Sequence, residues 1–173
     1  MPAEVIDTNV LCVASALESS ATVQTPVKDP TVLRRVHEWV VAFRNDRNRR
    51  LVMDVPEQTI RTEYQRNLPN ESYGRRVFIH KFTTGAVEYV PLTYWRNGSE
   101  FVANLPDPSY DRNFHDLGDR NLVASAHGSG APIVNAADSD WTEPDVQAGL
   151  NALGVRVVQL LTDDERRALR TRP

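Results

Sequence analysis

Acidic side chains follow two apolar segments of this chain, at the points where those segments end. Asp7 comes directly after the apolar residues 5–6, and Asp138 and Asp140 come a few positions after the apolar residues 133–134. A carboxylate next to a buried segment loses hydration, so it needs a polar or cationic partner to offset that cost. Because ligands of open parallel sheets bind beyond the carboxyl ends of the strands, these three acids are candidates for one site.

Asp119 is a further candidate, because its spacing from apolar residues turns it toward the protein interior. Leu122 and Val123 follow it by three and four positions, which places all three side chains on one side of a helix. The simpler interpretation of Asp119 is an N-cap, a position that Asp116 could also fill.

The segment after the second apolar stretch offers one more acid, and here Glu57 and Glu63 are alternatives. Ile60, Tyr64 and Leu68 recur at four-residue steps and mark the inner stripe of a helix. Glu57 lies closer to the centre of this stripe than Glu63 does. The helical spacing therefore does not select Glu63, and both acids remain candidates.

Several carboxylates that converge on one crevice repel one another unless a cation lies between them. Hard divalent ions such as Mg²⁺ and Mn²⁺ take oxygen ligands of this kind, together with water and substrate phosphate oxygens. Two such ions about 3.5–4 Å apart stabilise the attacking and leaving oxygens of a phosphodiester displacement. Asp138 and Asp140 could by themselves be turn formers, so the metal prediction depends on the whole set of acids.

Alternating apolar strands and amphipathic helices must position these acids. We expect strands at residues 3–7, 51–55, 87–92, 131–135 and 155–161, and helices at residues 10–18, 31–45, 56–68, 72–82, 119–129 and 143–153. This alternation predicts an α/β fold, a three-layer α/β/α sandwich around a central parallel sheet. We expect a single domain over residues 1–173, with an aromatic-rich elaboration at residues 70–115.

The composition excludes several classes of protein. Of the 173 residues, 40% are apolar and 25% are charged, as in globular proteins, and the single cysteine, Cys12, excludes an internal disulfide. No apolar run approaches the ~20 residues that cross a membrane, so we expect a soluble, cytoplasmic protein. The net charge of −3 argues against binding of nucleic acid by bulk positive charge. If a metal ion neutralises four of the acids, the rest of the protein has a net charge of +1. This charge is compatible with binding of nucleic acid through a metal ion at one site.

The middle of the chain is rich in aromatic and basic residues. Nine of the thirteen aromatic residues fall between residues 70 and 115, interleaved with arginines. Rings that stack bases beside cations that contact phosphates are typical of single-stranded RNA binding. The alternative is that most of these rings pack the segment onto the domain. The residues that we expect to bind substrate are Arg75, Arg76, Tyr94, Trp95 and Arg96.

Four motifs resemble those of PIN-domain ribonucleases, the fold of the VapC-type toxins. Residues 5–11, Val-Ile-Asp-Thr-Asn-Val-Leu, resemble their opening strand and turn. Residues 62–64 are similar to their second motif, an acid on the helix after the second strand. Residues 119–126 resemble the third motif, an Asp that opens a helix with small residues on its inner face. Residues 133–141 are similar to the last motif, a strand, an acidic turn and then an aromatic residue.

The resemblance implies an endoribonuclease that hydrolyses RNA with a metal-activated water. The ligands of Mg²⁺ or Mn²⁺ that it implies are Asp7, Glu63, Asp119 and either Asp138 or Asp140, with Asn9 as a supporting polar group. A toxin would have a cognate antitoxin that blocks the acidic site, and such domains often form homodimers.

Two other functions compete with a metal-dependent ribonuclease. A haloacid-dehalogenase-like phosphotransferase would use Asp7 as nucleophile, but it requires a second Asp where this chain has Asn9. The other alternative is a degenerate PIN domain that serves as a non-catalytic RNA-binding or assembly module.

Overall fold

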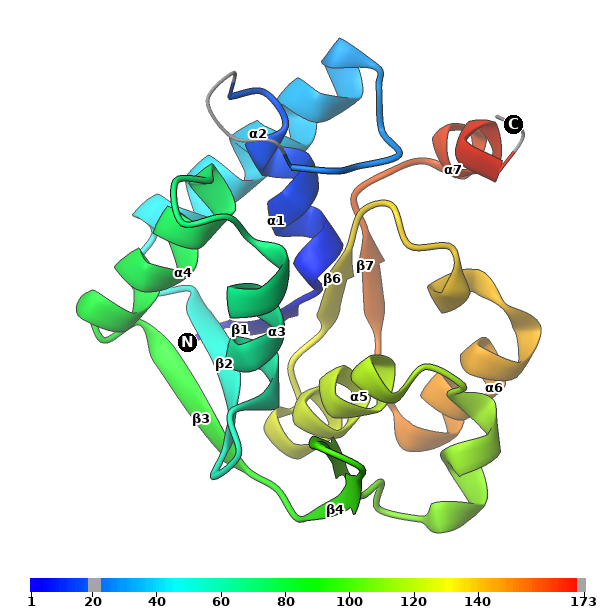
Figure 1. Ribbon diagram of the computed structural model, residues 1–173. Helices are drawn as coiled ribbons and strands as arrows, with labels where there is room; N and C mark the ends of the chain where they lie inside the picture. Colours follow the sequence, from blue (N-terminus) through cyan, green and yellow to red (C-terminus); the bar gives the residue numbers. More distant parts are fainter. Residues whose placement is uncertain (19–22, 171–173) are drawn as a thin grey trace.

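Five parallel strands form the central sheet, in the order β3-β2-β1-β6-β7. The computed structural model describes residues 1–18 and 23–170 (Figure 1). From β1 the chain continues to β2 on one side, while β6 pairs with β1 on the other side. The crevice of such a sheet lies where the strand order reverses, here beyond the carboxyl ends of β1 and β6. The bounds of the strands are β1 (Ala3–Ile6), β2 (Arg50–Val55), β3 (Val87–Pro91), β6 (Ile133–Asn135) and β7 (Val157–Gln159).

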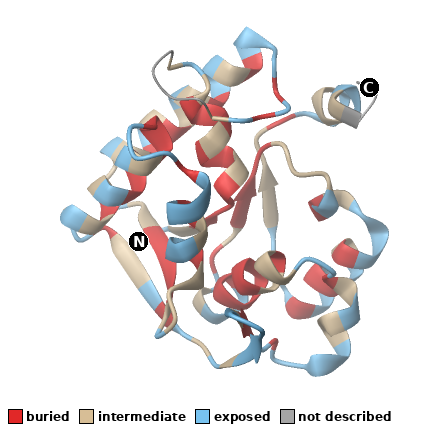
Figure 2. Ribbon diagram, viewed as in Figure 1, coloured by how far each residue is buried: buried red, intermediate tan, exposed pale blue. Residues whose placement is uncertain are grey.

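Helices cover both faces of this sheet, which confirms the predicted α/β fold with a central parallel sheet. Helices α1, α2 and α4 pack against one another on one face, and α5 packs on β1, β2, β3 and β6 from the other (Figure 1). Buried residues concentrate on the central strands β1, β2 and β6 and on the helix sides that face the sheet (Figure 2). The helices are α1 (Thr8–Ser15), α2 (Pro30–Asn45), α3 (Thr59–Asn67), α4 (Tyr73–Thr83), α5 (Leu117–Ser129), α6 (Pro144–Leu153) and α7 (Asp163–Arg170).

The central strand β1 is an uninterrupted apolar segment because both of its faces are covered. Val5 and Ile6 have no exposed surface and pair with Ile133 and Val134 of β6.

On one face of the sheet, α1 and α4 come very close together, because Gly74 has no side chain. A Cβ atom there would lie 2.7 Å from the Cβ of Leu11.

Helix α3 begins later than the sequence predicts. It starts at Thr59 rather than at Pro56, because the buried Asp54 accepts hydrogen bonds from the backbone N–H groups of Thr59 (2.7 Å) and Ile60 (3.0 Å). The prediction that Glu57 lies on this helix is therefore wrong, and Glu57 belongs to the turn before it.

Two other helices begin with an aspartate cap just outside the predicted ends. Asp29 caps α2 by accepting a hydrogen bond from the N–H of Thr31 (2.8 Å). Asp116 caps α5 by accepting one from the N–H of Gly118 (2.7 Å). Since Asp116 fills this position, the carboxylate of Asp119 is available for another role.

The aromatic-rich segment at residues 70–115 supplies α4 and the edge strand β3, followed by an antiparallel hairpin that the sequence analysis did not predict. The hairpin comprises β4 (Tyr94–Asn97) and β5 (Glu100–Ala103), and a short 3₁₀ helix, η1 (Pro108–Asn113), precedes α5. Gly98 has a φ of +62°, which suits the two-residue turn of the hairpin. The hairpin packs on α5, whose Asn121 Oδ1 accepts a hydrogen bond from the N–H of Ala103 (2.7 Å).

Within the described part of the chain, no helix has the length and apolar character needed to cross a membrane.

Candidate metal centre

Two adjoining clefts open at the carboxyl ends of β1 and β6. The wider cleft has a volume of about 820 Å³ and lies between α3, the β4–β5 hairpin and the start of α5. The narrower one, of about 460 Å³, lies beside the start of α1. Asp7, Glu63 and Asp138 line both clefts, and Asp119 lines the wider one. The fold thus brings acids from four separate segments of the chain to one place.

Asp7 is held in place by two hydrogen bonds. Its Oδ1 accepts from the backbone N–H of Asn9 (3.0 Å), which makes Asp7 the N-cap of α1. Its Oδ2 accepts from the indole Nε1 of Trp141 (2.7 Å). Burial raises the pKa of Asp7 to about 7 despite these bonds, with smaller contributions from the charges of Asp138 and Glu63. The cost of ionising this carboxyl is the cost that a bound cation would offset.

The closest group of acids comprises Asp119, Asp138 and Asp140. One carboxylate oxygen of each lies within 4.8 Å of the other two. Burial, followed by the charges of Asp138 and Asp7, raises the pKa of Asp119 to about 8. No hydrogen bond from any described residue stabilises the ionised carboxylate of Asp119. These three acids form a set of oxygen donors of the kind that hard divalent cations prefer.

Asp138 and Asp140, which the sequence could not separate, occupy different positions in the structure. Asp138 is half-buried and lines both clefts, and burial is the main reason that its pKa is raised. Asp140 is exposed, and its backbone N–H donates to Oδ1 of Asp138 (2.9 Å). Asp138 therefore lies deeper in the site, and Asp140 lies at its rim.

Glu63 and Glu57, the other pair of alternatives, also differ. Glu63 lies on α3, lines both clefts and accepts a hydrogen bond from the hydroxyl of Thr8. Burial raises its pKa, and the nearby charges of Asp116 and Asp138 act in the same direction. Glu57 lines only the wider cleft. Glu63 is therefore the glutamate that shares both clefts with Asp7.

Asn9 does not need to contact a ligand to support this site. Its side-chain Oδ1 accepts from the backbone N–H groups of Ala136 and Ala137 (both 3.0 Å), and its Nδ2 donates to Oδ1 of Asn135 (2.9 Å). Asn135 in turn donates to the backbone carbonyl of Asp138 (2.8 Å). These bonds join the start of α1 to the acidic turn after β6 and fix the distance between the two.

Two contributors to the site were not identified as such from the sequence. Trp141, seen there only as an aromatic residue after the acidic turn, is fully buried and donates to Asp7. Thr8 orients Glu63 from the first turn of α1. Neither residue type is charged, and each acts on a residue far away in the sequence, so no local pattern could reveal it.

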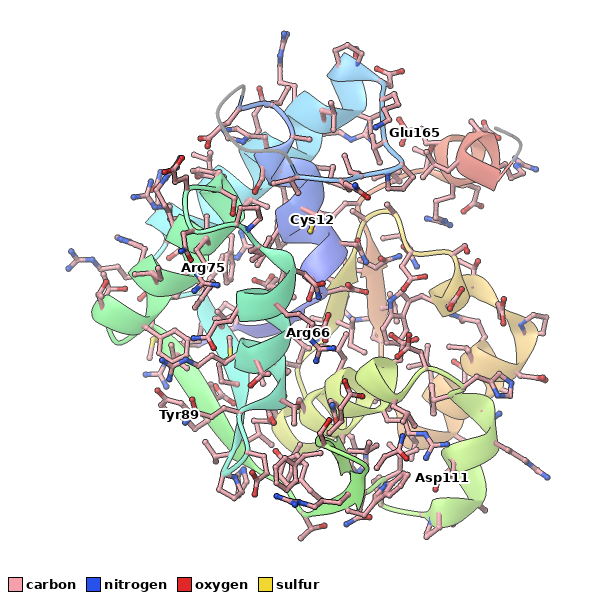
Figure 3. The ribbon with its side chains drawn as sticks, in the orientation of Figure 1. Cys12, Arg66, Arg75, Tyr89, Asp111 and Glu165 are labelled. Carbon is pink, nitrogen blue, oxygen red and sulfur yellow. The ribbon has the colours of Figure 1, made fainter. Side chains whose placement is uncertain are left out.

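The predicted substrate-binding arginines of α4 lie away from the site. The guanidinium group of Arg75 donates to the carbonyl of Gln65 (3.0 Å), and that of Arg76 donates to the carbonyl of Glu71 (2.7 Å) and to Glu18 (2.6 Å). Arg75 lies on the far side of α3 from the centre of the molecule (Figure 3). Neither arginine is among the residues that line the two clefts.

The predicted substrate-binding residues of the hairpin lie closer to the site but do not line it either. The hydroxyl of Tyr94 donates to the buried Asp54 (2.6 Å), so this ring anchors the hairpin. The guanidinium group of Arg96 lies 4.8 Å from the centre of the Phe101 ring, and Trp95 is 39% exposed. Of these aromatic residues, Phe101 lines the wider cleft.

No protein-family model, no curated protein and no solved structure that was compared with this chain matches it. The site itself is a group of carboxylates that could hold a metal ion, beyond the carboxyl ends of the parallel strands β1 and β6.

Proposed function

We propose that this protein is a PIN-like ribonuclease that depends on a divalent metal ion, Mg²⁺ or Mn²⁺, and hydrolyses RNA phosphodiester bonds. The observation that carries the proposal is the close approach of the carboxylates of Asp119, Asp138 and Asp140. Asp119 and Asp138 line the cleft that Asp7 and Glu63 also line. The order of these acids along the chain is the order of the motifs that resemble PIN domains.

The donor set fits such an ion. All candidate ligands are carboxylates, and burial together with mutual repulsion raises the pKa values of Asp7 to about 7 and of Asp119 to about 8. Acids in this condition gain from a cation that neutralises them. Asp119 and Asp138 would hold the ion, with Asp7, Glu63 and Asp140 around it. A bound divalent ion supplies Lewis acidity and charge neutralisation to a phosphodiester.

The protein's own contribution is to orient the acids before any ligand arrives. Trp141 and the start of α1 fix the carboxylate of Asp7, and Thr8 fixes that of Glu63. The Asn9–Asn135 pair holds the turn that carries Asp138. Such preorganisation lowers the cost of bringing like charges together at the reacting phosphate.

The proposal is tested by incubating the purified chain with single-stranded and structured RNAs in Mg²⁺, in Mn²⁺ and in a chelator. Cleavage is expected with either metal and not with the chelator. Asp7→Asn and Asp119→Asn should each reduce the rate by at least about 100-fold. Asp164→Asn is the matched control, because the Asp164 side chain is 88% exposed on α7 and lines neither cleft.

Two results would reject the proposal. If wild-type protein binds neither metal in a calorimetric titration and leaves all the RNAs intact, the acids do not form a metal centre. If it binds metal and RNA but cleaves nothing, the chain is the non-catalytic RNA-binding module instead.

A further inference from the structure

Acidic side chains make up a large part of the lining of the two clefts. Among the described residues that line either cleft, Arg66 is the only lysine or arginine. An RNA strand carries a negative charge at every phosphate, so a site surrounded by carboxylates repels the strand outside the metal position. The position of the one arginine therefore matters for how a strand can enter.

Arg66 lies where the two clefts join. It lines both of them, on the last turn of α3 and three residues after Glu63. In Figure 3 it lies near the centre of the molecule, beside α3. The charge of Arg66 partly offsets the rise in the pKa of Glu63, so the guanidinium group lies within electrostatic reach of that carboxylate.

In the free protein Arg66 has a partner that is easily displaced. Its Nη1 lies 3.1 Å from Oε1 of Glu100, which stands beside the turn of the β4–β5 hairpin. Both side chains are largely exposed, 61% for Arg66 and 52% for Glu100. An ion pair in this setting contributes little to stability. A phosphate group can replace Glu100, because a guanidinium group bonds to two phosphate oxygens at once.

We propose that Arg66 is the substrate-binding residue that contacts an RNA phosphate next to the scissile one, and that Glu100 holds Arg66 until that phosphate displaces it. This inference rests on the proposed function, since it assigns the substrate contact of the same site.

The neighbouring Arg61 offers a matched control on the same helix. Arg61 is exposed, donates to the side chain of Gln58 (2.9 Å) and lies over the ring of Phe82. It lines neither cleft. Arg61→Gln therefore removes the same charge from α3 as Arg66→Gln does, without touching the junction of the clefts.

The experiment measures RNA binding separately from cleavage. A fluorescently labelled single-stranded RNA of about ten nucleotides is titrated with each variant, with Ca²⁺ in place of Mg²⁺, and Kd is read from fluorescence anisotropy. Steady-state cleavage in Mg²⁺ then gives kcat and KM. The variants are Arg66→Gln, Arg66→Lys, Arg61→Gln, Glu100→Gln and the double variant Arg66→Gln/Glu100→Gln.

Arg66→Gln should weaken RNA binding about tenfold or more and raise KM correspondingly, with kcat changed much less. Arg66→Lys should restore part of the binding, and Arg61→Gln should bind as wild type does. Glu100→Gln should tighten binding about threefold, and this gain should vanish in the double variant, because Glu100 acts through Arg66.

Equal effects of Arg66→Gln and Arg61→Gln would overturn the proposal, because they would mean that only the overall charge of α3 matters. A loss of kcat with unchanged Kd would also overturn it. A gain from Glu100→Gln that persists in the double variant would show that Glu100 merely repels RNA. Absence of cleavage in wild type rejects the proposed ribonuclease, whereas the anisotropy series still decides whether Arg66 binds RNA.

Discussion

The indole Nε1 of Trp141 donates a hydrogen bond of 2.7 Å to Oδ2 of Asp7, although 134 positions separate the two residues. Trp141 is fully buried, and Asp7 is only 6% exposed. The bond joins the carboxyl end of β1 to the 3₁₀ turn η2 (Asp140–Thr142) after β6. It stabilises the ionised form of Asp7, because it lowers a pKa that burial raises.

Replacement of Trp141 by Phe should weaken both the fold and metal binding. The Asp7 carboxylate loses a buried donor, which costs about 1–3 kcal/mol of the free energy of unfolding. The pKa of Asp7 rises further, so a larger fraction of the Asp7 carboxyl groups is protonated at neutral pH. Because the protonated carboxyl binds cations poorly, the affinity for Mg²⁺ or Mn²⁺ falls. Calorimetric metal titration at pH 7 and chemical denaturation measure the two effects.

The control for this variant is Trp95→Phe, which makes the same change at a side chain that is 39% exposed and lines neither cleft. It should leave metal affinity unchanged. An equal loss of affinity in both variants would mean that the indole of Trp141 does not act through Asp7.

Asp119→Asn should stabilise the metal-free protein, and more so at higher pH. The pKa of Asp119 is about 8 in the folded protein against 3.8 ordinarily, so the folded state binds the proton more tightly. This group therefore favours folding at low pH, and its contribution is lost as pH rises from about 4 to about 8. Asparagine is neutral throughout, so the advantage of the variant grows over this range and is complete above about pH 8.

Thermal unfolding in a chelator at several pH values between 5 and 8.5 tests this expectation. At pH 8.5 the Tm of Asp119→Asn should exceed that of wild type by about 4 °C or more. Asp164→Asn should follow wild type at every pH, because its side chain is exposed. A difference between Asp119→Asn and wild type that stays constant with pH would contradict the assigned burial of the charge.

The strands of the sheet and most acids of the candidate metal site were predictable, because each strand and each of these acids has a local sequence pattern. Apolar residues 5–6 and 133–134 are followed by acids, and parallel strands bring such positions to the same edge. The inward direction of Asp119 followed from its spacing to Leu122 and Val123, and it is 9% exposed. The helical spacing left Glu57 and Glu63 open, because the start of α3 is set by Asp54, a residue outside the helix.

The parts that were missed either have only a weak local pattern or depend on contacts between distant segments. The hairpin turn contains Gly98, and its strands carry Tyr94 and Phe101, but the strands are only four residues long and pair only with each other. Arg66 carried no signal either, because one arginine on a polar helix face is ordinary. Its significance arises only from the acids that other segments place around it.

Metal affinity should increase steeply between pH 6 and pH 8.5. Protons compete with the ion for Asp7 and Asp119, whose pKa values are about 7 and about 8, so binding releases protons below those values. Calorimetry in two buffers of different ionisation enthalpy counts the protons released at each pH. Release should decrease toward zero above about pH 8.5, and a constant affinity across the range would show that neither acid binds the ion.

Tyr94→Phe should loosen the wall of the wider cleft by releasing the hairpin. The Tyr94 hydroxyl donates to Oδ2 of Asp54 at 2.6 Å, and Asp54 also holds the first turn of α3, which carries Glu63. Loss of a hydrogen bond to this buried carboxylate should cost about 1.5–3 kcal/mol of the free energy of unfolding, measured by chemical denaturation. Tyr89→Phe is the control, since Tyr89 is 54% exposed on β3, and it should change stability by less than about 0.5 kcal/mol. Equal stability of the two variants would show that the Tyr94–Asp54 bond does not anchor the hairpin.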